Sequence, residues 1–479
     1  MGIKYKIRVP KLAKDSFLVT LSNGLNYLVG AFWGVLLARL LGTDFFGNYI
    51  FWYSVSMIVF AVGEFGLTNY LTRELSKKGE QKNLICNYSK LILIVNSILV
   101  SCLVVYVKYS EFFFPYLVVG ITTIVIVLCD RLSTIFSSWH YAKKNALFIS
   151  NLSVLKNIFV LGVGFLFYLS EFSYFYILIV PAFFSLLRFL TTFIIILKKE
   201  KISFMDIIFF KISISNLKES ISAIWIFGAI AIITTIQLNS DAPILKFLGF
   251  SEHDFGVIGA ANRMKTVIAV TGSSLFSVVF PRLSKDFSIS KERFTDTFLK
   301  VFKPVFVFSI MLCSFLIIFS DKIILLLFGQ TYSDAVPFMI LFSYGSLSTV
   351  LILFGNTITA LNRQDFSLKI IVIIYTLVPI LKIILIPKYG SIIVGWIGAI
   401  GPWVGFIVNF AFIMKYLVPK INTSFIIKMI VIILIGLVLP VLANYYNVNE
   451  FVSFFVIFMI IIIFSKVFKV LSIKSLVTS

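Results

Sequence analysis

Long runs of apolar residues recur from one end of this chain to the other, and they restrict its fold more than any other feature. A helix needs about 20 predominantly apolar residues to cross the hydrocarbon core of a membrane. A spanning β-barrel would instead show short segments of alternating polarity. The runs here are long and continuous, and 59% of the 479 residues are hydrophobic while 13% are charged. The sequence therefore predicts an all-α integral membrane protein.

Polar clusters divide the apolar sequence into about fourteen predicted transmembrane helices. The predicted spans are 17–41, 48–72, 91–107, 116–137, 154–169, 174–197, 221–248, 256–281, 305–328, 335–361, 368–386, 392–416, 425–443 and 451–468. The first span is too long for a signal-peptide core and lacks a cleavage site, so we expect it to be retained. The loops on one side of the membrane are all short, so no large domain is expected there.

The basic residues are distributed unevenly between the predicted loops. The formal net charge is +21, and most Lys and Arg residues fall on the side of the N-terminus. The loops and span ends on the opposite side carry only Lys108, Lys246, Lys322 and Lys388. Because an excess of Lys and Arg marks the cytoplasmic side, we expect both termini in the cytoplasm. The positive charge does not indicate nucleic-acid binding, since the chain has almost no soluble surface for a basic patch.

An internal repeat relates the two halves of the chain. Leu41-Gly42 followed by Phe46-Gly47 recurs as Leu248-Gly249 followed by Phe255-Gly256, and residues 73–77 are echoed by 282–285. The offsets are 207 (249 minus 42), 209 (256 minus 47) and 208 (283 minus 75) residues. Three matches in order at one offset favour a duplication, and an even number of spans between the copies makes it a parallel repeat.

Several short motifs carry a resemblance to a known family. They are Ala38-Arg39-Leu40-Leu41-Gly42, Phe46-Gly47-Asn48-Tyr49, Gly63-Glu64-Phe65-Gly66-Leu67 and Thr72-Arg73-Glu74-Leu75, with later stretches at 280–284 and 327–332. Together they resemble the O-antigen and capsule repeat-unit flippases, the Wzx-like polysaccharide transporters. Their superfamily is that of the multidrug/oligosaccharidyl-lipid/polysaccharide exporters.

The resemblance implies a fold, a substrate and a location. It implies two six-helix lobes around a central cavity, which we place at residues 1–215 and 216–420, with two additional C-terminal spans in residues 421–479. The implied substrate is an undecaprenyl-pyrophosphate-linked oligosaccharide in the bacterial cytoplasmic (inner) membrane. The implied partners are membrane lipids and the polymerase and chain-length proteins of polysaccharide synthesis.

Ionisable residues inside the predicted spans are the candidate functional residues. The basic ones are Arg39, Arg131, Arg188, Arg263, Lys265 and Lys382, and the acidic ones are Glu64, Asp130 and Asp241. Each such residue at mid-span costs roughly 2.5–3.5 kcal/mol, so we expect them to face a wet cavity or a partner. Because basic groups exceed acidic ones and arginine binds phosphate oxygens bidentately, the set suits an anionic cargo.

Roles follow for most of these residues, each with a structural alternative. Substrate binding is predicted for Arg39, Arg131, Arg188, Arg263 and Lys265, and coupling to H⁺ or Na⁺ for Glu64, Asp130 and Asp241. Arg39 could instead snorkel to the interface, and Lys382 could be structural. Asp130 and Arg131 point about 100° apart on a helix, so each should have its own partner on another helix. Glu64 could pair with Arg131 rather than carry an ion.

Enzymatic function is not expected. No GxxxxGK[ST] phosphate loop and no HExxH motif occurs, and the chain has only two histidines, His140 and His253. Cysteine spacing predicts no metal site, and no cofactor or nucleic-acid partner is expected.

The predicted function is translocation of a lipid-linked oligosaccharide by alternating access. One alternative is a multidrug or cation antiporter of the same fold, which should favour acidic groups in its cavity. A second is a membrane-embedded polysaccharide polymerase or ligase, which should carry a large outer loop.

Overall fold

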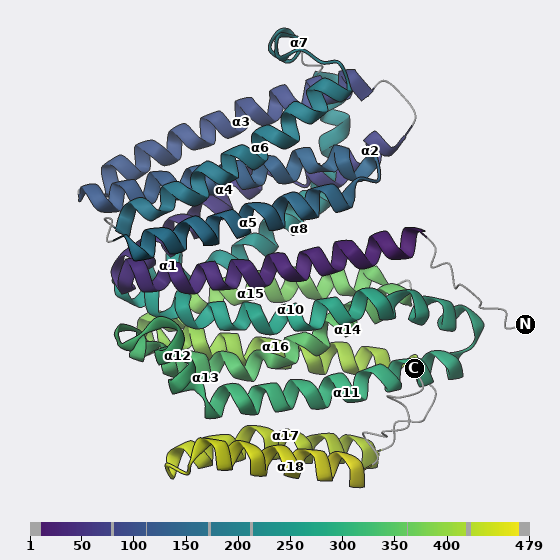
Figure 1. Ribbon diagram of the computed structural model, residues 1–479. Helices are drawn as coiled ribbons and strands as arrows, with labels where there is room; N and C mark the ends of the chain where they lie inside the picture. Colours follow the sequence, from purple (N-terminus) through teal and green to yellow (C-terminus); the bar gives the residue numbers. More distant parts are fainter. Residues whose placement is uncertain are drawn as a thin grey trace, which may run out of the picture. The chain divides into compact units, whose positions relative to one another are not determined.

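The computed structural model describes residues 11–77, 81–111, 113–170, 174–210, 214–361, 363–417 and 423–468. Every regular element among these residues is a helix (Figure 1). The α-helices of the first part are α1 (Lys11–Glu64), α2 (Leu67–Ser76), α3 (Gln81–Ser110), α4 (Phe114–Ala142), α5 (Ala146–Leu169), α6 (Ile179–Lys199), α7 (Phe204–Phe209), α8 (Ile214–Asn239) and α9 (Asp241–Phe247).

The second part of the chain continues the helical pattern. Its α-helices are α10 (Glu252–Ile289), α11 (Lys291–Ile318), α12 (Ser320–Phe328), α13 (Val336–Tyr344), α14 (Ser348–Ala360), α15 (Gln364–Tyr389), α16 (Ile392–Met414), α17 (Thr423–Tyr445) and α18 (Glu450–Val467). Three short 3₁₀ helices are η1 (Tyr174–Leu178), η2 (Gln330–Ala335) and η3 (Gly345–Leu347).

These helices confirm a multi-pass membrane protein. By length and composition, 10 helical segments of the described residues can cross a membrane, and Gly228–Asn239 and Val350–Ala360 are shorter apolar helices. Several spans predicted as continuous contain a break, as where α11 ends at Ile318 and α12 begins at Ser320. A break of one or two residues leaves local hydropathy unchanged, so the apolar pattern could not show it. The count of about fourteen stays a prediction.

The chain forms two compact units. Unit 1 comprises Met1–Leu41 and Asn48–Pro243, and unit 2 comprises Gly42–Gly47 and Ile244–Ser479. The short segment Gly42–Gly47 of α1 therefore belongs to unit 2. The lobe bounds given above differ from these units, and the division into two six-helix lobes and two further spans stays a prediction.

α4 occupies a central place in unit 1, since it packs against α2, α3, α5 and α6. One apolar core joins α4 to α2, α3 and α6, built from buried residues that include Leu71, Ile85, Leu132 and Phe193. Polar side chains on the faces of α4 that meet these helices are consequently in contact with protein.

A polar seam joins α1 to α5 within unit 1. Ser22 donates to Asn151 at 2.9 Å, and the Asn157 amide donates to the side-chain oxygen of Asn26 at 2.6 Å. In a membrane, hydrogen bonds between helices stabilise their packing because lipid offers no alternative partner. The polar residues early in α5 thus belong to a helix interface.

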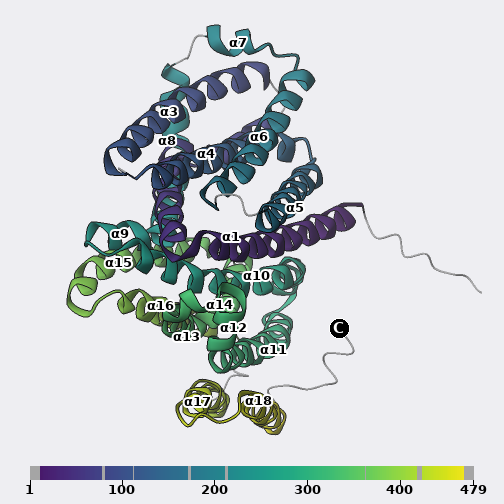
Figure 2. The same cartoon turned by 60° about the vertical axis from the view of Figure 1, so that its left-hand side comes forward.

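Stacked phenylalanine rings form the core of unit 2. The rings of Phe302 and Phe354 are 5.8 Å apart between centroids, and those of Phe354 and Phe406 are 5.4 Å apart, which links α11, α14 and α16. Such offset aromatic contacts add about 0.5–1.5 kcal/mol each beyond burial. At the C-terminal end, α17 and α18 lie side by side and pack on α11 (Figure 2).

The repeated Leu-Gly and Phe-Gly motifs adopt matching conformations. Gly42 has φ 69° and Gly249 has φ 83°, values that L side chains rarely adopt. Within unit 2, an added Cβ at Gly47 would overlap the carbonyl of Glu252, and one at Gly256 would overlap the carbonyl of Thr43. Only glycine permits so close a crossing of the two segments.

Candidate functional site

A break between α1 and α2 positions the first charged residue of the site. α1 ends at Glu64, the backbone then passes through Phe65 (φ 40°) and Gly66 (φ 73°), and α2 begins at Leu67. A left-handed conformation at a residue other than glycine costs roughly 1–2 kcal/mol, so the fold imposes this turn. The break leaves the Glu64 carboxylate at a helix C-terminus, where the helix dipole disfavours an anion. Glu64 therefore needs a cation.

Arg131 of α4 supplies that cation. Its Nη1 donates to Glu64 Oε2 at 2.9 Å, and the Thr68 hydroxyl donates to the other carboxylate oxygen at 2.7 Å. The side chains of Arg131 and Glu64 are 23% and 14% exposed, so water screens the pair only weakly. The structural alternative for Glu64 is thus observed.

Asp130, the neighbour of Arg131, faces a different pair of helices. Lys156 of α5 donates to both carboxylate oxygens of Asp130 at 2.9 Å, and Arg188 of α6 lies 3.5 Å from one of them. Lys156 also contacts the Ser185 hydroxyl at 3.1 Å. Because adjacent helical residues point about 100° apart, α4 serves two ion pairs, and each has its partner on another helix.

Five charged side chains around α4 form two ionic groups, which together we call the ionic cluster: Glu64 with Arg131, and Asp130 with Lys156 and Arg188. Two carboxylates face three cations, so the cluster carries one surplus positive charge. The buried Nε atoms of Arg131 and Arg188 have no hydrogen-bond partner among the described residues. An unsatisfied buried donor costs about 1–3 kcal/mol, which an incoming acceptor such as a phosphate oxygen would recover. The cluster is therefore suited to binding an anion.

The remaining predicted site residues lie elsewhere. Arg39 is exposed on α1, Asp241 begins α9, and Arg263 is partly exposed on α10 in unit 2. Lys382 on α15 is 4% exposed, and the side chain of Lys265 lies outside the described residues. No group of three or more His, Cys, Asp or Glu side chains that could hold a metal ion occurs in the described part of the chain.

Sequence reasoning missed Lys156. The span was predicted to begin at residue 154, which placed this lysine at its edge, whereas α5 begins at Ala146. Ten residues of helix correspond to about 15 Å, so Lys156 lies well inside α5. Ser150 and Asn151 fall between the predicted spans 116–137 and 154–169, but both bond to side chains of α1. Polar residues spaced along one helical face were the signal that could have revealed it.

Solved structures with the same fold are membrane transporters. The lipid II flippase MurJ, in an inward closed conformation, matches with a TM-score of 0.73 at 17% identity, covering 94% of this chain and 98% of that one. An inward-facing multidrug resistance transporter of the MATE family, of the MOP superfamily, matches with a TM-score of 0.61 at 14% identity, over 84% and 98% of the two chains. A MOP superfamily transporter from Pyrococcus furiosus matches with a TM-score of 0.55 at 14% identity, covering 84% of this chain and 95% of that one.

Sequence comparison identifies the family. No curated protein is significantly similar in sequence. The family model described as "Polysaccharide biosynthesis protein" matches residues 12–287, which is more than half of the chain. The structural neighbours are transporters and flippases rather than enzymes. The chain accordingly belongs to the polysaccharide biosynthesis protein family, and it has the fold of these transporter structures.

Proposed function

We propose that this transporter is a flippase for undecaprenyl-pyrophosphate-linked oligosaccharide repeat units, such as those of O-antigen. It moves them from the cytoplasmic to the outer leaflet of the bacterial inner membrane by alternating access, with both termini in the cytoplasm. The family match supports a role in polysaccharide synthesis, and the fold supports a transporter.

The surplus cation of the ionic cluster is the observation that carries the proposal. Arg188 reaches Asp130 only at 3.5 Å, while Lys156 holds both oxygens of that carboxylate at 2.9 Å. Arg188 thus retains N–H donors for a second anion, and its planar guanidinium group can donate two parallel hydrogen bonds to phosphate oxygens. Both carboxylates of the cluster already face cations, which fits a cationic cargo poorly. Proton or sodium coupling through Glu64, Asp130 or Asp241 stays a prediction.

The membrane potential would assist such transport. Moving one charge through 100 mV is worth about 2.3 kcal/mol. An inside-negative potential drives an anion outward, so a pyrophosphate cargo of charge about −2 that crosses 100 mV gains about 4.6 kcal/mol.

Arginine substitutions at position 188 test the cargo assignment. Arg188→Ala should abolish translocation of a fluorescent lipid-linked oligosaccharide in proteoliposomes. Arg188→Lys should retain part of the translocation, because lysine keeps the charge but lacks the planar guanidinium group that donates two parallel hydrogen bonds. The matched control is Arg73→Ala, which removes an arginine whose side chain is 58% exposed and should leave translocation unchanged.

Two results would contradict the proposal. Normal translocation by Arg188→Ala, at wild-type levels of folded protein, would remove Arg188 from the transport path. Efflux of a cationic dye by the wild-type protein, with no movement of the lipid-linked sugar, would instead establish a multidrug exporter.

A further inference from the structure

α7 presents an apolar surface beside the membrane-spanning helices of unit 1. Figure 1 shows it at the edge of that unit, and it packs against α3. One side of the segment is anchored in the core by Ile202 and Ile207, which are 5% and 1% exposed. Exposed apolar side chains cover the rest: Phe204 (53%), Met205 (59%), Ile208 (44%) and Phe209 (76%). Four such side chains on a helix of six residues form a patch suited to a membrane interface.

Polar contacts hold α7 at both ends. At its start, the Ser203 backbone N–H donates to Asp206 at 3.0 Å, and the Ser203 hydroxyl accepts from the backbone of Met205 at 3.3 Å. At its end, the Lys90 ammonium donates to the carbonyls of Ile208 and Phe210 at 2.6 and 3.0 Å. A single helical turn is unstable alone, so these contacts fix the direction in which the apolar side chains point.

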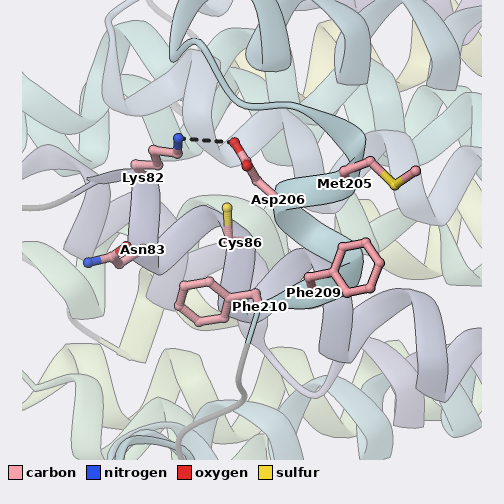
Figure 3. A pocket seen from close by; sticks show the side chains of 7 residues that line it. All are labelled: Lys82, Asn83, Cys86, Met205, Asp206, Phe209 and Phe210. Carbon is pink, nitrogen blue, oxygen red and sulfur yellow. Dashed lines mark ion pairs between the residues drawn. The ribbon is translucent and has the colours of Figure 1, made fainter.

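A pocket of about 430 Å³ lies between α3 and α7. Its lining residues are Lys82, Asn83, Cys86, Met205, Asp206, Phe209 and Phe210 (Figure 3). Figure 3 shows the Lys82 ammonium and the Asp206 carboxylate facing each other across the upper edge, with the rings of Phe209 and Phe210 below. The volume lies within the roughly 300–1,000 Å³ that small-molecule sites occupy.

The Lys82–Asp206 pair is open to a ligand. Its two charged atoms are 3.0 Å apart, and the side chains are 52% and 42% exposed. The Ser203 backbone N–H and the Lys82 ammonium hold the pKa of Asp206 below its usual range, so the carboxylate stays ionised at neutral pH. Exposed ion pairs contribute little to stability, so the two groups can separate at little cost. A matching ligand has a cation and an anion close together next to an apolar body.

We propose that this pocket binds the phosphoethanolamine headgroup of a phospholipid. Lys82 contacts the phosphate and Asp206 contacts the ammonium, while the exposed apolar side chains of α7 lie among the upper parts of the acyl chains. Phosphatidylglycerol has no ammonium, so its phosphate would approach Asp206 uncompensated. Nearby Lys198, Lys199 and Lys201 are exposed and attract lipid phosphates in general. This site is separate from the ionic cluster and does not depend on the proposed cargo.

Lipid titration of the purified full-length protein tests the proposal. After delipidation in detergent, palmitoyl-oleoyl phosphatidylethanolamine and the corresponding phosphatidylglycerol are added, and bound lipid is counted by native mass spectrometry. We expect the wild-type protein to retain the ethanolamine lipid about tenfold better, the effect of one charge-assisted contact. Lys82→Ala should weaken that retention about tenfold. Asp206→Asn should reverse the preference, because Lys82 then faces the phosphate alone.

Two variants control for other causes. Lys198→Ala removes an exposed lysine that does not line the pocket and should leave the preference for the ethanolamine lipid unchanged. Ser203→Ala weakens the cap of α7 but keeps the Asp206 carboxylate, so it should keep the preference for the ethanolamine lipid.

Three outcomes would overturn the proposal. The first is equal retention of the two lipids by the wild-type protein. The second is loss of the preference in Ser203→Ala to the same extent as in Asp206→Asn, which would make helix folding rather than charge responsible. The third is displacement of the ethanolamine lipid by added undecaprenyl phosphate, which would assign the pocket to the cargo lipid.

Discussion

Replacing Glu64 by glutamine tests whether its ion pair with Arg131 stabilises unit 1. The charged atoms are 2.9 Å apart, and both side chains are less than a quarter exposed. Removing one partner of a buried pair leaves an uncompensated charge and costs about 3–5 kcal/mol. Glutamine keeps the size of the side chain and can still accept the Thr68 hydroxyl. Since Arg131 retains some access to water, we expect the free energy of unfolding to fall by about 3 kcal/mol, the lower end of that range.

Equilibrium unfolding in mixed micelles, titrated with sodium dodecyl sulfate and followed by circular dichroism, measures this change. A double-mutant cycle with Arg131→Gln isolates the pair, because the double variant leaves no unpaired charge. The double variant should be less destabilised than the sum of the single variants by at least about 1 kcal/mol. Additivity within about 0.5 kcal/mol would refute the pairing argument. A purely ion-coupling Glu64 would instead give ordinary stability and a lost response to a pH or sodium gradient.

Two further predictions use the same unfolding measurement. Gly256→Ala should destabilise by about 1–3 kcal/mol, because its methyl would overlap the carbonyl of Thr43. Gly355→Ala, with nothing within 4 Å, should be neutral or slightly stabilising, and equal effects of the two changes would contradict the close approach. Lys156→Met should cost less than Glu64→Gln, since Asp130 keeps Arg188 as a partner; a larger loss would show that Arg188 does not share that carboxylate.

Much of the fold was accessible from the sequence because the membrane simplifies the problem. Helices are the form in which apolar segments of this length satisfy their backbone groups in lipid, so class and approximate spans followed directly. Helical geometry alone predicted that the side chains of Asp130 and Arg131 point in different directions. The structure confirms that the two residues have separate partners. The pairing of Glu64 with Arg131 was foreseen only as one alternative, because hydropathy does not show which helices touch.

The parts that escaped prediction depend on tertiary contacts. The depth of Lys156 in α5 could not be seen, because Ser150 and Asn151 read as loop residues until α1 is placed beside them. The left-handed turn at Phe65 is likewise invisible, since phenylalanine gives no local signal for positive φ. The pocket beside α7 joins residues more than a hundred positions apart in the sequence, such as Lys82 and Asp206.

The glycine crossing in unit 2 has the reciprocity of a dimer interface. Gly47 faces the carbonyl of Glu252, and Gly256 faces the carbonyl of Thr43. Positions 43 and 252 correspond in the repeat, as do 47 and 256, so one contact is made twice with the roles exchanged. In an isologous interface, residue i of one copy meets residue j of the other, and j meets i. Fusion of a two-fold homodimer into one chain leaves a reciprocal contact of this kind. The contact also couples the evolution of Gly47 and Gly256, because a side chain gained at either position displaces the backbone that accommodates the other.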